Sequence, residues 1–310
     1  MFERGDQMSG SKIRYLLGID GGGTKTEFLL TDLNQNKIKR ISLGTSNPVN
    51  IGIENLKELL NQGISDICKD LDFAEISVFA GLAGSGADDI KSEIHNFLGR
   101  FGFGAYSNGS DGDSTIAVAL KGENGAAVIM GTGIIAFSCS EGEKHRIGGR
   151  GYMIDKGGSG FCLGSDALNS AFEFIDGRGG SELILKLVQN RINQRLEASV
   201  SEIYAGGATF VASFAPVIFE AFKQGDADAE RILDRNAYEA AKLIKTARKY
   251  LKEHDKTVIC GGLCKQKDIL KPFLDKYLED DLNLIFSDEP IINGAIFLAK
   301  SNVLDSEKLC

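Results

Sequence analysis

Residues 15–30, YLLGIDGGGTKTEFLL, combine groups that bind phosphate with one that repels it. Glycine puts no Cβ between a backbone N–H and a ligand, and it also permits positive φ. Successive N–H groups then form an anion-binding nest, to which the hydroxyls of Thr24 and Thr26 would add donors. Asp20 would repel a bare phosphate, but Mg²⁺ is commonly held by a carboxylate together with phosphate oxygens. This stretch therefore predicts a magnesium–polyphosphate site.

Two further glycine turns extend this prediction. The segment MGTGI, residues 130–134, is expected to close on the same phosphate chain. Gly261 and Gly262 follow an apolar run and would let adenine or ribose approach the backbone. One such turn is also typical of an ordinary Asp-Gly hairpin, but three favour nucleotide binding. The chain lacks the GxxxxGK[ST] loop, so the predicted site is not of the P-loop type.

Two carboxylates in SNGSDGDSTIAVAL, residues 107–120, are candidates for acid–base chemistry. Phosphoryl transfer needs a group that orients and deprotonates the acceptor. We expect a helix to begin near Thr115, and acids just before a helix often cap it. We assign the cap to Asp113 and expect Asp111, outside the helix, to be free to reach a hydroxyl.

The elements that position these residues follow from the spacing of apolar residues. Strands are predicted over 13–19 and 26–31, and residues 32–43 continue as a turn and a third strand, giving a β-meander. Residues 50–71 have apolar positions at helical spacing. Residues 125–140, GAAVIMGTGIIAFSCS, repeat the opening pattern of strand, glycine turn and strand.

The repeated pattern predicts an α/β fold with two domains and a cleft between them, where ligands of such folds usually bind. We expect a polar tail over residues 1–12 and an N-terminal domain over 13–120. The C-terminal domain would span 121–289 and include a helical insertion within 181–255. A closing helix over 290–300 is expected to pack back on the first domain.

Composition limits the possible partners. The 310 residues carry a net charge of −8, which argues against nucleic acid and anionic membranes. No apolar run approaches the roughly 18 residues of a membrane span, and the polar start predicts no export signal. The CGGLC pair, Cys260 and Cys264, matches neither zinc nor redox spacing. We therefore expect a cytoplasmic enzyme with reduced thiols that acts on a small molecule.

Together these motifs resemble the sugar-kinase, Hsp70 and actin superfamily, and within it the branch of N-acetylglucosamine kinases and BadF/BadG-type ATPases. DGGGTKTEFLL and GTG match its two phosphate motifs, SDGDSTIA its catalytic-acid segment and CGGL its adenosine motif. SNP matches the loop asparagine, and GGRGYMIDKGGSG resembles the sugar-binding GGWGxxxGDEGS. The likeness spans residues 13–300. It implies a two-domain actin-like ATPase fold of the ribonuclease H type and an ATP-dependent kinase for an N-acetylated amino sugar.

The resemblance also implies roles for single residues around the sugar. Asp20 would bind magnesium, through water, and Asp111 would take the proton from a sugar hydroxyl, the 6-hydroxyl in this branch. Asn47 would hold sugar hydroxyls, and Gly149 would lie by the ring or the N-acetyl group. The branch commonly forms homodimers, so we expect one here.

Around ATP, the resemblance implies contacts with each glycine turn. Gly261 and Gly262 would lie beside adenosine, with Ser213 on the opposite wall. The positions implied around the phosphates are Gly22, Gly23, Thr24, Lys25, Gly131, Thr132 and Gly133.

Two departures from the branch bear on the sugar. Arg150 stands where the branch has a tryptophan, and Lys156 stands at the sugar-binding aspartate, a role that Asp155 would take from one residue earlier. These changes suggest a substrate with a carboxylate, such as N-acetylmuramic acid, which Arg150 would pair bidentately and to which Lys156 would add positive charge. The alternative is that Arg150 is a solvated loop residue.

Two other functions compete with a sugar kinase. An ATPase that activates a 2-hydroxyacyl-CoA dehydratase or benzoyl-CoA reductase would need cysteines to ligate an iron–sulfur cluster, whereas Cys139 and Cys162 are isolated in the sequence. A sugar-responsive regulator would need a DNA-binding helix-turn-helix before residue 13. The sequence favours the kinase over both.

Overall fold

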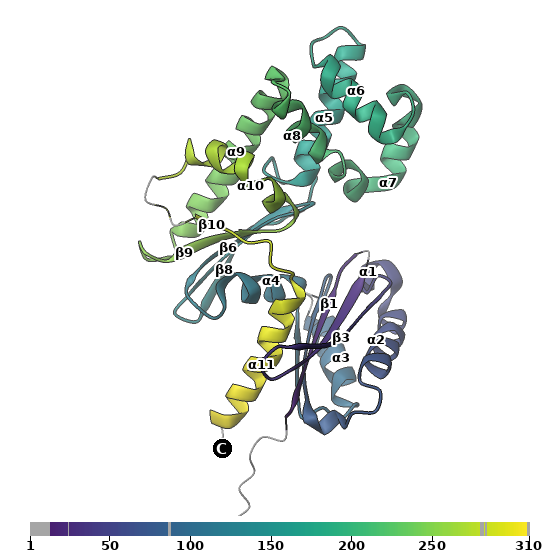
Figure 1. Cartoon of the computed structure of the whole chain (residues 1–310), viewed down its shortest axis with the longest axis vertical. Coiled ribbons are helices and arrows are strands. Elements are labelled where there is room, and N and C mark those ends of the chain that lie inside the picture. The colour runs from purple at the N-terminus through teal and green to yellow at the C-terminus, as the bar shows by residue number, and fades with distance from the viewer. Residues whose placement is uncertain (1–12, 24, 86–87, 280–281, 283, 309–310) are drawn as a thin grey trace, which may run out of the picture. The chain divides into compact units, whose positions relative to one another are not determined.

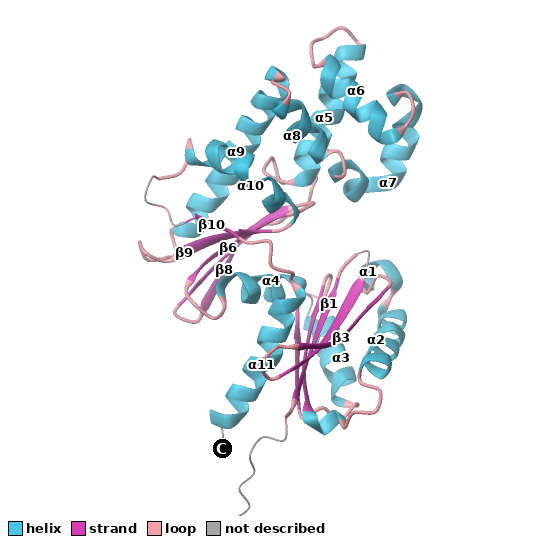
Figure 2. Cartoon of the chain, viewed as in Figure 1, coloured by secondary structure: helices cyan, strands magenta, loops and turns pink. Residues whose placement is uncertain are grey.

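The computed structural model describes residues 13–308 except residue 24, residues 86–87, residues 280–281 and residue 283 (Figure 1). The chain divides into two compact units. Unit 1 comprises Met1–Lys121 and Glu289–Cys310, and unit 2 comprises Gly122–Asp288. In each unit, helices pack against a sheet (Figure 2).

The sheet of unit 1 has the strand order β3-β2-β1-β4-β5. The strands β1, β2 and β3 form an antiparallel meander, and β4 and β5 continue the sheet in parallel with β1. Its strands are β1 (Tyr15–Gly21), β2 (Thr26–Asp32), β3 (Lys37–Leu43), β4 (Ile76–Leu82) and β5 (Ala105–Gly109). Its helices are α1 (Pro48–Ile51), α2 (Ile53–Ile67), η1 (Phe73–Glu75), α3 (Asp88–Gly99), α4 (Asp111–Leu120) and α11 (Ile292–Lys308).

Both faces of this sheet are buried because successive residues of a strand point to opposite sides. Leu17 and Ile19 belong to the core with α2 and α3, whereas Leu16 belongs to the core with α11. Helix α11 approaches closely because Gly294 has no side chain, and a Cβ there would lie 1.8 Å from the Ser114 carbonyl oxygen. The C-terminal helix thus packs on strands and on α4 of unit 1.

Unit 2 repeats the same sheet design, with the order β10-β9-β6-β7-β8. Again three antiparallel strands are followed by two that run parallel to the first. The similarity of residues 15–30 and 125–140 predicted this repetition. The strands are β6 (Gly125–Met130), β7 (Ile134–Ser140), β8 (Glu143–Gly148), β9 (Lys256–Cys260) and β10 (Leu284–Phe286).

Helices pack on this second sheet and make up most of the rest of unit 2. The bounds are α5 (Gly160–Ile175), α6 (Glu182–Ile192), η2 (Leu196–Ser199), α7 (Val200–Ala212), α8 (Ala215–Lys223), α9 (Ala227–Arg248), η3 (Gly262–Gln266) and α10 (Lys267–Asp275). The expected helical content of residues 181–255 is confirmed. Among the described residues no single helix is long and apolar enough to cross a membrane; one pair, Leu196–Ala212 and Ala215–Lys223, bent by 63°, meets that test only when its halves are counted together.

Candidate functional site

Two carboxylates meet at the carboxyl end of the parallel strands of unit 1. Asp20 on β1 pairs with Gly81 on β4, which pairs in turn with Gly109 on β5, two residues before Asp111. Strand β1 runs to Gly21 and not to residue 19 as expected, so Asp20 lies inside the strand. Burial raises the pKa of Asp20 to about 6, and the charge of Asp111 adds to this rise. The two acids are therefore electrostatically coupled.

Helix α4 begins at Asp111, four residues earlier than expected, because a capping box forms. The Ser110 hydroxyl accepts from the Asp113 N–H, and the Asp113 carboxylate accepts from the Ser110 N–H at 2.8 Å. The capping role of Asp113 is confirmed. The expectation that Asp111 lies outside the helix is wrong, because Asp111 is its first residue.

The Asp111 carboxylate remains accessible at this helix start. Its Oδ1 accepts from the Gly112 N–H at 3.0 Å, and its Oδ2 has no hydrogen bond from any described residue. Surrounding protein partly desolvates the carboxyl and raises its pKa, with a smaller contribution from Asp113. A carboxylate with one free oxygen and a raised pKa is suited to accept a proton.

The acid pair also fits a magnesium ion. Among the described residues, no group of three or more His, Cys, Asp or Glu side chains is placed to hold a metal ion. Magnesium does not need one, because it keeps several waters and binds one or two carboxylates together with phosphate oxygens. A cation beside Asp20 would also counteract the burial and the repulsion from Asp111 that raise its pKa.

Two glycines of the strands bring the start of α4 to this place. A Cβ on Gly81 would lie 2.2 Å from Ser114 Oγ, and a Cβ on Gly109 would lie 2.6 Å from Asp113 Oδ2. The sequence reasoning did not identify either glycine. For Gly81 the signal was glycine inside an otherwise apolar strand, which often marks a close backbone approach, whereas Gly109 ends the more polar strand β5.

The first glycine turn closes the β1–β2 hairpin, with the Gly22 N–H donating to the Lys25 carbonyl at 2.9 Å. The expected positive φ is wrong for Gly22 and Gly23, since neither has one. A Cβ on Gly23 would meet no atom within 4 Å. Nothing within the described protein therefore requires glycine at position 23.

The neighbours of this turn differ from expectation in part. Thr26 is not a free donor, because its buried hydroxyl donates to the Gly44 carbonyl at 2.8 Å. Lys25 is exposed, and its ammonium lies 3.1 Å from the Glu27 carboxylate. Thr24 lies outside the described residues.

Asn47 lies next to this turn, because the Gly22 carbonyl accepts from the N–H of the preceding residue, Ser46. Its Oδ1 caps α1 by accepting from the Val49 N–H at 3.0 Å, and its Nδ2 has no acceptor among the described residues. A Cβ on Gly84 would lie 2.5 Å from this Oδ1. The side chain thus keeps two N–H groups for a ligand.

The second turn, in unit 2, is fastened to the start of α5. The carbonyls of Gly131 and Thr132 accept from the N–H groups of Gly160 and Phe161 at 2.7 and 3.0 Å. Gly131 and Gly133 also lack positive φ, and a Cβ on either would meet no atom within 4 Å. The Thr132 residue is exposed.

The third turn lies beside the second, because β9 pairs with β6. Gly261 has φ of 101°, and a Cβ there would lie 2.6 Å from the Met130 carbonyl oxygen, so the fold itself requires this glycine. Gly262 has ordinary φ and open space. Ser213 ends α7 and lines a recess with residues of α6 and α7, none of them from a glycine turn.

The loop that carries the expected sugar contacts of unit 2 is braced by Asp155. Its two carboxylate oxygens accept from the N–H groups of Arg150 and Gly151 at 3.3 and 3.1 Å. Gly149 has φ of 66°, and a Cβ there would lie 2.5 Å from Ile135 Cδ1, so its backbone needs glycine. The Arg150 guanidinium is exposed and has no hydrogen bond or ion pair with any described residue.

The fold is the two-domain fold of the actin-like ATPases, and the expected fold class is confirmed. The family follows from the sequence match. The chain belongs to the BadF/BadG/BcrA/BcrD ATPase family, whose model matches residues 17–296.

The relatives agree with this assignment. The chain is 28% identical to the N-acetylmuramic acid/N-acetylglucosamine kinase of Clostridium acetobutylicum, over 93% of this chain and 99% of that one. It is 28% identical to the N-acetyl-D-glucosamine kinase of Dictyostelium discoideum, over 86% of this chain and 90% of that one. A solved structure of a putative N-acetylglucosamine kinase from Porphyromonas gingivalis superposes with a TM-score of 0.74 at 16% identity, covering 94% and 99% of the two chains.

Proposed function

We propose that this protein is an ATP-dependent kinase that phosphorylates an N-acetylated amino sugar, N-acetylglucosamine or N-acetylmuramic acid, at the 6-hydroxyl. Its family is one of ATPases, and both curated relatives named above are kinases of these sugars. The observation that carries the proposal is the coupled pair of acids, Asp20 and Asp111, next to a glycine turn with unfilled space.

Asp111 is the proposed base. Its free Oδ2 would accept the proton of the sugar hydroxyl as that oxygen attacks the γ-phosphate. Its raised pKa brings its basicity closer to the working pH than that of an ordinary aspartate. The hydrogen bond from Gly112 and the capping box beneath it hold the carboxylate in place. Asp113 is committed to that capping box, so it is not the base.

The nucleotide would be held mainly by backbone. Glycines whose conformation and packing do not require glycine leave room for phosphate or ribose to reach the N–H groups. Asp20 would hold magnesium through water, and bound magnesium would supply positive charge to the phosphate oxygens. The open glycines proposed for this contact are Gly23, Gly131, Gly133 and Gly262.

Polar groups would hold the sugar. The free amide of Asn47 would bind hydroxyls, and the backbone around Gly149 would lie by the ring. The unpaired guanidinium of Arg150 would pair with the lactyl carboxylate that distinguishes N-acetylmuramic acid from N-acetylglucosamine. Asp155 has its carboxylate engaged with the backbone of its own loop, so we propose for it a positioning role and not a direct contact.

An ATP-coupled screen tests this function. ADP release is measured with N-acetylglucosamine, N-acetylmuramic acid, glucosamine and glucose, and also without sugar. We expect ADP release to depend on an N-acetylated sugar and to appear with equal amounts of sugar phosphate. Release of ADP that no sugar changes would contradict the proposal and favour an ATPase without a sugar acceptor.

The structure does not favour the alternative function, an ATPase activator with an iron–sulfur cluster. Thiolates ligate an iron–sulfur cluster, whereas burial raises the pKa of the Cys162 thiol. Purified anaerobically, the protein should show no absorption in the visible range.

A further inference from the structure

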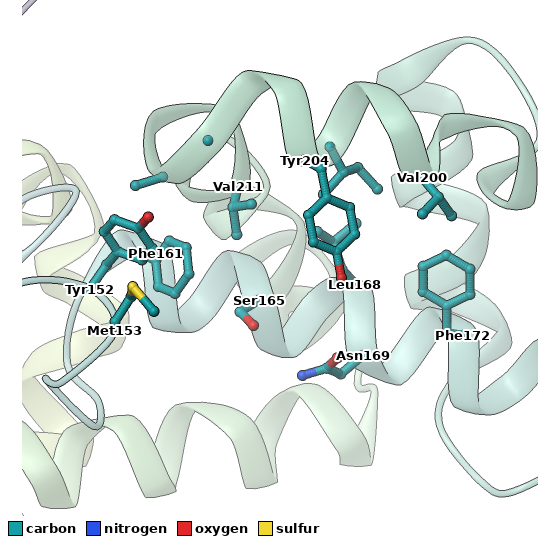
Figure 3. A pocket seen from close by; sticks show the side chains of 13 residues that line it. Tyr152, Met153, Phe161, Ser165, Leu168, Asn169, Phe172, Val200, Tyr204 and Val211 are labelled. Atoms are coloured by element: carbon teal, nitrogen blue, oxygen red, sulfur yellow. The ribbon is translucent and has the colours of Figure 1, made fainter.

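A groove between helices α5 and α7 has a mainly apolar lining that the proposed chemistry leaves unexplained. It lies within unit 2 and has a volume of about 540 Å³. Tyr152 and Met153, from the loop braced by Asp155, close one end (Figure 3). Small-molecule sites typically have volumes of roughly 300–1,000 Å³. We call it the α5–α7 groove.

The two helices explain why the groove exists. They touch where Gly164 meets α7, since a Cβ there would lie 1.9 Å from the Val211 carbonyl oxygen. Helix α7 is interrupted at Gly207, whose φ is 59° and ψ −158°. Its first half, from Val200, then borders open space. The Tyr204 side chain extends from α7 over the groove near Leu168 (Figure 3).

The lining combines aromatic rings with unused polar groups. The hydroxyls of Ser165 and Tyr204 and the amide of Asn169 have no hydrogen-bond partner among the described residues. Tyr204 is 84% exposed, so most of its ring surface is available to a ligand. No Lys, Arg, Asp or Glu is among the described lining residues. The rings come from the closing loop and both helices: Tyr152, Phe161, Phe172 and Tyr204.

This chemistry matches an uncharged saccharide. A pyranose ring presents apolar C–H faces that pack on aromatic rings, while its hydroxyls bond to hydroxyl and amide side chains at the edge. An anion such as a phosphate would lack a cationic partner in this groove. The groove also begins two residues after Arg150, on the same loop as the proposed sugar contacts.

We propose that the α5–α7 groove is a second saccharide subsite, which holds a further sugar ring linked to the amino sugar. This inference rests on the proposed kinase function, because it assigns the first ring to the loop at Gly149 and Arg150. It extends the substrate class from free amino sugars to short oligosaccharides of them. Tyr204 would stack on the second ring, and Asn169 would bond to its hydroxyl or N-acetyl group.

Equilibrium titration of the full-length protein tests this subsite. The probes are N-acetylglucosamine and its β-1,4-linked disaccharide, N,N′-diacetylchitobiose. We expect the disaccharide to bind at least about tenfold more tightly than the monosaccharide. Tyr204→Ala and Asn169→Ala should each weaken disaccharide binding about fivefold or more and leave monosaccharide binding unchanged. Tyr238→Ala, which removes an exposed tyrosine of α9 outside the groove, is the matched control and should change neither.

Two results would overturn the subsite. One is a disaccharide that binds no more tightly than the monosaccharide, and the other is a set of groove variants that weaken binding of both sugars equally. A loss of self-association in Tyr204→Ala, with saccharide binding intact, would instead make the groove a contact between copies of this chain. Groove-dependent disaccharide binding without phosphorylation of any sugar would support the subsite and contradict the proposed kinase. The two proposals can therefore fail separately.

Discussion

The two sheets share one design, yet their central hairpins carry different chemistry. At the second-last pair of the β1–β2 ladder, Asp20 faces Glu27, and at the same pair of the β6–β7 ladder, Ile129 faces Ile135. Both hairpins then end in a glycine turn with ordinary φ and unfilled space. The two hairpins share a turn whose backbone is not covered by side chains, and they differ in the charge of the residues next to the turn.

This difference suggests a division of labour between two copies of one scaffold. Unit 1 carries the acids Asp20 and Asp111, whose charges can bind a metal and accept a proton. Unit 2 presents open glycines, the cation Arg150 and the α5–α7 groove, which are suited to binding and not to acid–base chemistry. If the account is correct, changes in unit 1 should affect catalysis and changes in unit 2 should affect affinity and selectivity.

The largest expected effect is on the chemistry of unit 1. Asp111→Asn keeps an oxygen to accept from the Gly112 N–H but removes the base, so kcat should fall by about 10²–10⁴-fold while ATP binding persists. Kinase activity and nucleotide titration measure the two effects. Asp113→Asn is the matched control: it should weaken the capping box by about 1 kcal/mol and keep most of the activity. If Asp113→Asn lost activity and Asp111→Asn kept it, the base would be Asp113.

The decrease of kinase activity at low pH should reflect the ionisation of Asp20 and Asp111. Both carboxylates must be ionised to act, and the pKa of Asp20 is raised to about 6. Activity should therefore fall about tenfold for each pH unit below that value at limiting magnesium. Saturating magnesium should move this decrease to lower pH, because the cation favours the ionised form. A decrease near pH 4 at every magnesium concentration would contradict the coupling.

Asp20 should also destabilise the protein without magnesium. Its folded pKa is raised above the ordinary value of 3.8, so the folded state binds more protons between about pH 4 and 6, and stability falls as pH rises through that window. Asp20→Asn should then raise the free energy of unfolding at pH 8 by about 1–3 kcal/mol and have no such effect at pH 3.5. Urea titrations at both pH values measure this. A variant that is less stable at pH 8 would mean that Asp20 has a structural role.

The smallest expected effect concerns selectivity in unit 2. Arg150→Ala should lower kcat/KM for N-acetylmuramic acid about tenfold relative to N-acetylglucosamine, since one charge-assisted contact is lost. Lys156→Ala, on the same loop, is the control and should change the ratio less. Equal losses on both sugars would leave Arg150 a solvated surface residue.

Features set by neighbouring residues were largely predictable. The glycine turns, the helix over Ile53–Ile67 and the repeated hairpin follow from local patterns. The start of α4 was expected four residues too late, although the capping-box spacing of Ser110 and Asp113 is a local signal for the observed start.

Features set by contacts between distant segments were not predictable. The Thr26 hydroxyl donates to the carbonyl of Gly44, and the carbonyl of Met130 leaves no room for a side chain at Gly261. The sequence around Thr26 or Gly261 does not indicate either contact. The interruption of α7 at Gly207 has a local signal in the Gly206–Gly207 pair, but the close approach of Gly164 to α7, which shapes the α5–α7 groove, has none.

We expect the open glycines to serve a bound ligand and not the fold. Gly131→Ala separates these two roles, with Gly261→Ala as its partner in the adjacent turn of unit 2. The melting temperature and the ATP affinity of each variant are measured. We expect Gly131→Ala to melt as the wild type does, or slightly higher, and to bind ATP at least about tenfold more weakly, whereas Gly261→Ala should lower the melting temperature. Unchanged ATP affinity in Gly131→Ala would contradict the account.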